Sequence, residues 1–228
     1  MPLSKDQVVD LLKTSPVFGG IPDDEIVRLA TLARQDYFPD RTLLIPADTQ
    51  PDQVWYVLEG NVQTGIFSQS GKPASLPPIA SGEWTPWIGC FLDTPLPHEY
   101  WCDAQSRLLS LPTKTVRMLA QRHPQIYLEA LKTIAGRLNG MMSWYLASRL
   151  LDPEKQLAYL LAGLYPIGQQ DPFLLALSLE QIAAMGFGTR QRVSRILTKL
   201  EERGLIKRGF KSISILSRRE LVQFSAVP

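Results

Sequence analysis

The strongest constraint on how this chain folds is a change in the spacing of its apolar residues after Pro124. From there a seam alternates strictly between steps of four and three residues: Tyr127, Leu131, Ile134, Leu138, Met141, Tyr145 and Ser148. This spacing predicts one long helix with an apolar seam over about three heptads. Such a seam is typical of helices that pair with an identical partner, so we expect a homodimer. The alternative is a helix that packs only against its own domain.

Before Pro124 the pattern is that of short strands. Short apolar runs alternate with Gly, Pro, Asp and Asn, at Thr42–Ile45, Val54–Leu58, Val62–Phe67 and Arg107–Leu111. Several such runs at close spacing predict antiparallel strands in a barrel or sandwich. Glu59-Gly60-Asn61 and Ser70-Gly71-Lys72 are predicted hairpin turns. Helical spacing at residues 3–14 and 22–35 predicts two helices ahead of the strands.

A domain boundary is predicted at Leu151-Asp152-Pro153, because Asp followed by Pro ends one helix and opens the next. The chain then divides into residues 1–124, with N-terminal helices and a strand-rich domain, a long helix at 125–150, and a C-terminal domain at 151–228. Mixed helices and strands of this kind predict the α+β class.

Charge is distributed unevenly between these parts. Residues 178–228 hold ten Lys or Arg and four acids, a net charge of +6, whereas the rest of the chain carries −4. A basic end on a mildly acidic body favours a module that binds a polyanion. A solvated basic surface is the alternative.

The strongest functional motif lies between Ser178 and Ile206. Ser178 and Gln181 form a predicted capping box for a helix over Leu179–Met185, and Gly186-Phe187-Gly188 ends that helix. Thr189 is the predicted cap of a second helix that runs to Glu202. Two short helices joined by a glycine-containing turn predict a helix-turn-helix, whose second helix enters the major groove of DNA. The basic segment after Gly204 predicts a hairpin, or wing, beside the DNA backbone.

The predicted DNA-contacting residues are mostly cationic or amide side chains at the start of that second helix and in the wing. They are Thr189, Arg190, Gln191, Arg192, Ser194, Arg195, Lys199 and Lys211. Arginine pairs with guanine edges and glutamine with adenine edges, while Arg, Lys, Ser and Thr also hold phosphates.

Over nearly its whole length, the chain resembles the bacterial regulators typified by the cyclic-AMP receptor protein and the fumarate–nitrate reduction regulator, the CRP/FNR family. The resemblance rests on the segments Val54–Val62, Gly82-Glu83, Leu108–Pro112 and Thr189–Ile206, the last being highly specific. It implies a cyclic-nucleotide-binding-like jelly-roll β-barrel, a dimerisation helix and a winged helix-turn-helix. The implied function is that of a homodimeric transcription regulator, with double-stranded DNA, a small-molecule effector and, for an activator, RNA polymerase as partners.

The sequence departs from this family at the effector site. Cys90 stands where the resemblance leads us to expect a glutamate, and Leu96-Pro97 where it leads us to expect Arg-Ser. No Lys or Arg occurs between Pro73 and Ser106, and a buried phosphate without a cation is strongly disfavoured. Cyclic nucleotides are therefore not expected. The N-terminal cysteine cluster of the iron–sulfur-sensing members is also missing.

Aromatic and sulfur-containing side chains predict instead an apolar effector pocket: Trp84, Trp87, Cys90, Phe91, Tyr100, Trp101, Met141 and Met142. The alternative is that most of them are ordinary core or seam residues. No cofactor is expected, with haem ligation by Cys90 and His98 or Met142 as a minor alternative.

Catalytic and metal-binding motifs are missing from the sequence, so we expect no enzyme and no metal site. Two cysteines and the lack of a long apolar run or leader pattern lead us to expect a cytoplasmic protein without a membrane partner. The competing function is a ligand- or redox-sensing protein whose DNA-binding unit is vestigial.

Overall fold

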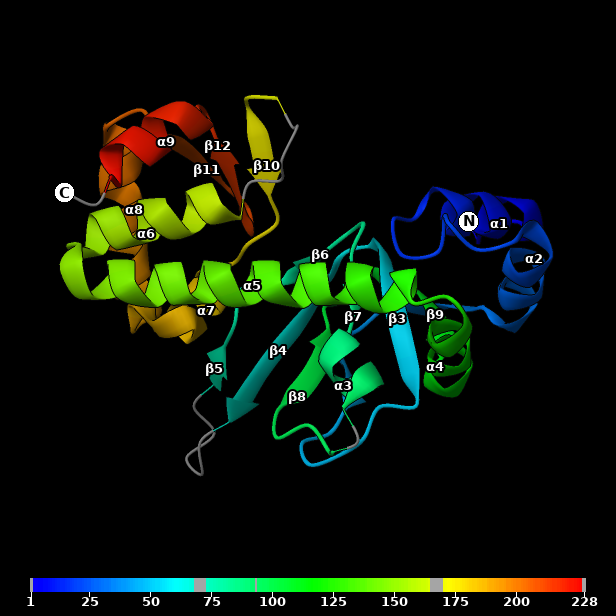
Figure 1. The fold of residues 1–228 in the computed structure, drawn as a ribbon. Helices are drawn as coiled ribbons and strands as arrows, with labels where there is room; N and C mark the ends of the chain where they lie inside the picture. Colours follow the sequence, from blue (N-terminus) through cyan, green and yellow to red (C-terminus); the bar gives the residue numbers. More distant parts are fainter. Residues whose placement is uncertain (1, 68–72, 93, 165–169, 227–228) are drawn as a thin grey trace. The chain divides into compact units, whose positions relative to one another are not determined.

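The computed structural model describes residues 2–67, 73–92, 94–164 and 170–226 (Figure 1). Contacts divide the chain into two compact units. Unit 1 comprises Met1–Ile66 and Pro78–Gly136, and unit 2 comprises Phe67–Pro77 and Arg137–Pro228. The predicted turn at Ser70-Gly71-Lys72 lies outside the described residues.

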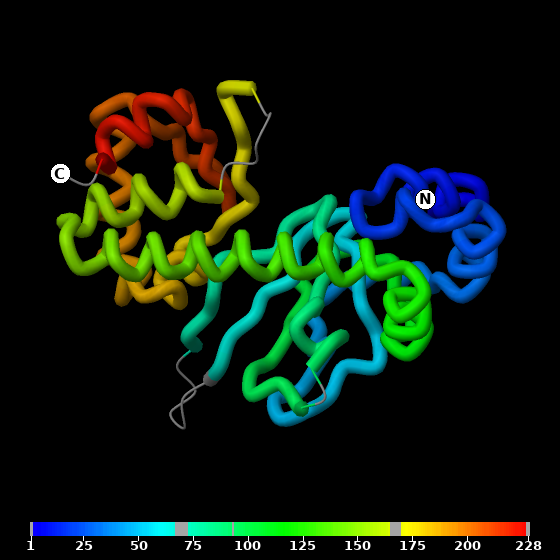
Figure 2. The backbone as a smooth tube through the Cα atoms, viewed as in Figure 1, coloured from blue at the N-terminus to red at the C-terminus, as the bar shows by residue number. Residues whose placement is uncertain are grey.

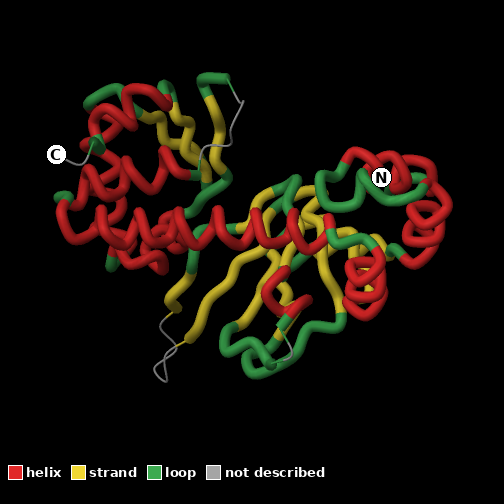
Figure 3. The backbone as a smooth tube through the Cα atoms, in the orientation of Figure 1, coloured by secondary structure: helices red, strands yellow, loops and turns green. Residues whose placement is uncertain are grey.

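Unit 1 joins helices to strands, as the secondary-structure colouring of Figure 3 shows. Its helices are α1 (Lys5–Thr14), α2 (Asp23–Leu32), α3 (Trp87–Phe91), α4 (Thr113–Arg122) and the first half of α5 (Gln125–Leu150). Its strands are β1 (Arg34–Phe38), β2 (Thr42–Ile45), β3 (Gln53–Glu59), β4 (Asn61–Phe67), β6 (Ile79–Ala80), β7 (Trp84–Thr85), β8 (Glu99–Cys102) and β9 (Ser106–Pro112). The helix predicted over 22–35 is too long, because the chain leaves the helix after Leu32 and β1 pairs with β9.

The strands form two antiparallel sheets, in the orders β1-β9-β3-β7 and β2-β8-β4, with β6 paired to β4. This arrangement fits the predicted jelly roll. The predicted turn at Glu59-Gly60-Asn61 is confirmed, because Gly60 joins β3 to β4 with φ +84°. A side chain there would also collide with Ser106.

The central strands β3 and β9 are buried on both faces, since alternate residues point to opposite sides of a sheet. Trp55, Val57 and Leu108 join one core, which takes side chains from both sheets. Val54 and Leu109 join a second core.

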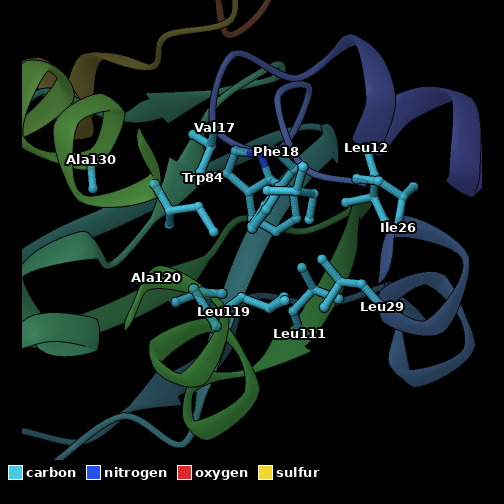
Figure 4. Close-up of a cluster of buried hydrophobic side chains, with 14 of the residues drawn as sticks. Leu12, Val17, Phe18, Ile26, Leu29, Trp84, Leu111, Leu119, Ala120 and Ala130 are labelled. Atoms are coloured by element: carbon cyan, nitrogen blue, oxygen red, sulfur yellow. The ribbon is translucent and has the colours of Figure 1, made fainter. Parts of the chain in front are cut away.

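The second core packs the helices of unit 1 against the sheet (Figure 4). Trp84 lies at its centre: its ring meets the Phe18 ring edge-on at 5.2 Å, and its indole N–H donates to Ser15 Oγ at 3.3 Å. Trp87, on α3, is 4% exposed and lies 6.2 Å from the Trp84 ring. These indoles fix α3 against the body of unit 1.

Unit 2 contains β5 (Pro73–Ser75), the second half of α5, α6 (Pro153–Gly163), β10 (Phe173–Leu175), α7 (Leu179–Ile182), the π-helical turn η1 (Ala183–Phe187), α8 (Arg190–Glu202), β11 (Ile206–Gly209), β12 (Ser212–Ile215) and α9 (Arg218–Phe224). Strand order is β10-β12-β11, so the predicted wing gains a third strand. The chain trace in Figure 2 follows these elements in order.

Helix α5 confirms the predicted long helix, and the boundary between the units falls within it. Ile126 and Ala130 are buried in the core of unit 1, whereas Trp144 packs against the core of unit 2. Each half of α5 is therefore part of one unit, which differs from the predicted boundaries at residues 124 and 150. The three-part division stays a prediction.

Burial of α3 makes its stability contribution testable. We expect Trp87→Ala to destabilise unit 1 by about 3–5 kcal/mol, because it leaves a large cavity in a packed core. Ile88→Ala, at the next position of α3 and 38% exposed, is the matched control and should cost less than about 1 kcal/mol. Guanidinium unfolding followed by circular dichroism measures both, and equal midpoints for the two variants would contradict this packing.

Candidate nucleic-acid interface

The turn between α7 and α8 is built from local signals. Ser178 Oγ accepts the Gln181 backbone N–H at 3.2 Å, and the Gln181 side chain accepts the Ser178 N–H at 2.7 Å, which completes the predicted capping box. Gly186 and Gly188 have φ of +102° and +92°. Because side chains disfavour this region of φ, two glycines allow the chain to reverse tightly before α8. The first helix ends at Ile182 and continues as the π turn, rather than as an α-helix to Met185.

Helix α8 has one buried face and one exposed face. Thr189 caps it by accepting the Arg192 backbone N–H at 3.2 Å. Its buried side chains are Val193, Ile196, Leu197 and Leu200. Burying this apolar stripe in the core of unit 2 leaves the side chains of Arg190, Gln191, Arg192, Arg195 and Lys199 exposed.

The exposed cations of α8 fall into two groups. Arg190 Nε lies 2.8 Å from Glu180 Oε1, and Lys199 Nζ lies 2.5 Å from Glu154 Oε1 on α6. Among the described residues, no acidic side chain pairs with Arg192 or Arg195. These two arginines therefore offer unneutralised charge, whereas Lys199 also ties α8 to α6.

The hairpin β11–β12 is held beside α8 by Arg208. Arg208 Nε donates to Glu201 Oε2 at 2.6 Å, and its Nη1 donates to Thr198 Oγ1 at 3.0 Å. The hydrogen bond from the Arg208 backbone N–H, followed by that from its side chain, lowers the pKa of Glu201. The acid thus stays ionised and keeps the wing in place.

The tip of the hairpin carries an aromatic side chain that the sequence analysis did not single out. Phe210 is 90% exposed, and Lys211 Nζ lies 5.5 Å from the centre of its ring. Lys211 has φ +50°, which turns the chain at the tip. The sequence feature that could have identified this side chain is a large apolar residue, Phe210, between Gly209 and Lys211 in a predicted turn.

A cleft of about 470 Å³ separates α8 from the hairpin within unit 2. Arg190 and Ser194 line one side, and Phe210 and Lys211 line the other. The structure thus brings predicted residues of α8 and of the wing to the same concave surface. The lining carries three cations, Arg190, Arg208 and Lys211, against two acids, Glu180 and Glu201. A groove with this small positive excess beside an exposed helix suits the backbone of a nucleic acid.

The predicted effector residues are gathered only in part. Trp84, Trp87 and Cys90 are buried in the helical core of unit 1, and Phe91 packs at its edge. The Trp87 and Phe91 rings stack at 6.0 Å, and Phe91 contacts the Tyr127 ring at 4.8 Å.

The remaining effector residues lie elsewhere. Tyr100 is buried in the core between the two sheets. Trp101, the next residue of β8, points to the opposite face, where Arg41 lies 4.4 Å above its ring. Met141 and Met142 are exposed on α5 in unit 2. Unit 1 therefore does not bring all of the predicted effector residues to one site. Tyr100 and Trp101 point to opposite faces because successive residues of a strand such as β8 alternate in direction.

In the part of the chain that the structure describes, no group of three or more His, Cys, Asp or Glu residues could hold a metal ion. Burial raises the pKa of the Cys90 thiol to about 12, against an opposing effect of Arg117. The thiol is therefore protonated at neutral pH, which disfavours it as a metal ligand.

No helix among the described ranges has the length and hydropathy of a membrane span.

Comparison with known proteins gives a consistent result. The family profile of the Crp-like helix-turn-helix domain matches residues 146–224. The cAMP-activated global transcriptional regulator CRP of Pasteurella multocida is 24% identical over 188 residues, which cover 80% of this chain and 90% of that protein. The probable transcriptional regulator flp of Lacticaseibacillus casei is 24% identical over 213 residues, 92% of this chain and 95% of that protein.

Solved structures show the same fold. FixK2 from Bradyrhizobium japonicum superposes with a TM-score of 0.72 at 17% identity, over 86% of this chain and 98% of that one. The relatives are transcription regulators, so the chain is not an enzyme. The domain match, the relatives and the shared fold together support a DNA-binding transcription regulator of the CRP/FNR type, with a Crp-like helix-turn-helix domain at residues 146–224.

Proposed function

We propose that this protein is a homodimeric, cytoplasmic regulator that reads a palindromic DNA site with one α8 from each subunit. The observation that carries the proposal is the exposed row of Arg190, Gln191, Arg192 and Arg195 on a helix whose other face is buried. A helix of this kind fits the major groove, and the wing then lies beside the backbone.

The exposed side chains have different proposed roles. Arg190, Gln191 and Arg195 contact base edges, because Arg suits guanine and Gln suits adenine. Arg192, Lys199 and Lys211 mainly meet phosphates, with Thr189 and Ser194 as polar contacts near the groove. The bond of Lys199 to Glu154 means that Lys199 must share its charge with that acid. The family resemblance leads us to expect Glu where Gln191 stands, and Gln suits adenine rather than cytosine, so the half-site should differ at that base.

Two substitutions separate these roles. Arg195→Ala should lose about 1–3 kcal/mol of sequence discrimination, whereas Lys211→Ala should weaken all DNA alike and lower the salt slope by about one. Titrations of a selected site and a random duplex at several salt concentrations measure both effects. An equal loss on both duplexes for Arg195→Ala would contradict base contact by Arg195.

The dimer proposal rests on the seam of α5. Leu131, Leu138 and Tyr145 are 60%, 55% and 56% exposed in the single chain, although they follow the four-and-three spacing. An exposed apolar line on one long helix favours burial against a copy of itself. A two-fold dimer in turn accounts for a palindromic site.

Sedimentation of a charged seam variant checks the dimer. Leu138→Glu should cost several kcal/mol of association, because it buries an unpaired carboxylate. Asn139→Glu adds the same charge one residue away, off the seam, and should remain a dimer. If Leu138→Glu sediments as the wild type does, the seam is not the interface.

We also propose that a non-nucleotide, apolar effector controls DNA binding. Leu96 is 2% exposed, where the family resemblance leads us to expect an arginine, and residues 73–106 contain no Lys or Arg. Arg117 on α4 donates instead to the Leu92 carbonyl at 3.2 Å. The contact of Phe91 with Tyr127, the first residue of the α5 seam, is the proposed docking point, where an effector would meet both α3 and α5. Trp84, Trp87 and Cys90 would form its buried wall, and no resident cofactor is proposed.

Calorimetry tests the expectation that cyclic nucleotides do not bind this protein. Titration of the purified dimer with cyclic AMP or cyclic GMP should give no saturable heat, because residues 73–106 contain no Lys or Arg that could hold the cyclic phosphate. Micromolar binding of either nucleotide would contradict it.

A further inference from the structure

Glu180 is an acidic side chain beside the N-terminal end of α8, where the proposed base contacts lie. Glu180, in the first turn of α7, bonds Arg190, the first residue of α8, through Oε1 and Nε at 2.8 Å. Its side chain is 54% exposed and lines the cleft beside the wing. An acid at this place repels the phosphates of DNA. It therefore weakens binding unless its contact with Arg190 supplies something in return.

The atoms of the contact indicate what it supplies. A guanidinium can meet the O6 and N7 of guanine side-on, through Nε and one terminal nitrogen, or end-on, through both terminal nitrogens. In this structure Nε is occupied by Glu180. The end-on pair is left to bind the base, and the ion pair narrows the conformations of the long side chain before DNA arrives.

The other acid–cation pairs of unit 2 differ from this one. Glu154 is only 19% exposed and holds Lys199 across to α6. Glu201 holds the wing through the backbone and side chain of Arg208. All three pairs join elements of the fold, since Glu180 lies on α7 and Arg190 on α8. Only the Glu180 pair holds a side chain with a proposed role in reading a base.

We propose that Glu180 is a positioning residue that sets sequence discrimination by orienting Arg190 for an end-on contact with guanine. This inference rests on the proposed function, in which α8 enters the major groove. Glu180 raises the ratio of operator to random affinity while it lowers affinity for DNA in general.

Binding by the full-length protein tests the inference. The probes are a palindromic duplex selected by the wild type from a random pool and a scrambled duplex of equal length. Glu180→Ala should lower the ratio of the two affinities by about three- to tenfold, a fraction of what one bidentate base contact supplies. Its affinity for the scrambled duplex should be unchanged or higher. Glu180→Gln, which keeps an acceptor for Nε, should retain most of the ratio.

Two further variants isolate the path through Arg190. In an Arg190→Ala background, Glu180→Ala should cause no additional loss of discrimination. Glu202→Ala is the matched control, because it removes one exposed acid from α8, the helix of Arg190, and no described residue pairs with Glu202. It should leave the ratio unchanged.

Each contrary result has its own meaning. If Glu180→Ala strengthens binding to both duplexes equally, the acid only competes with phosphate and the inference is wrong. An equal loss on both duplexes with a lowered melting temperature shows a purely structural role and also overturns it. If Arg190→Ala keeps full discrimination, the inference fails while DNA binding stands; if the wild type selects no duplex, the proposed function itself fails.

Discussion

The burial of one face of α8 determines most of what unit 2 presents to its surroundings. Val193, Ile196, Leu197 and Leu200 are in the core, and this fixes the rotation of the helix about its axis. Because the helix cannot turn, Arg190, Arg192 and Arg195 must face outwards. The aliphatic stripe is thus the physical reason that a charged surface exists at all, although no member of the stripe would touch DNA.

Local signals made this part of the fold predictable. The capping box at Ser178, the cap at Thr189 and the glycines of the turn act over three or four residues, so they can be identified without tertiary information. The long helix was equally clear from its spacing. Short elements were missed: α3 has only five residues, and β10 becomes a strand only because β12 pairs with it.

The candidate sites show the same limit. The pairing of Lys199 with Glu154 joins residues 45 positions apart, and no local pattern indicates it. The separation of Tyr100 from Trp101 could have been predicted, because neighbouring residues of a strand point to opposite faces. The aromatic residues of α3 gave a composition signal for a pocket, but composition does not distinguish a pocket from a packed core. Trp84 and Trp87 proved to be core residues.

The spacing of half-sites tests the central claim, that two α8 helices held by one dimer read DNA together. Inserting about five base pairs, half a helical turn, between the half-sites of a selected operator rotates one of them to the far side of the duplex. Our account predicts that affinity measured by titration then falls to that for random DNA of equal length. Unchanged affinity after the insertion would show that the half-sites are bound independently, and would contradict the account.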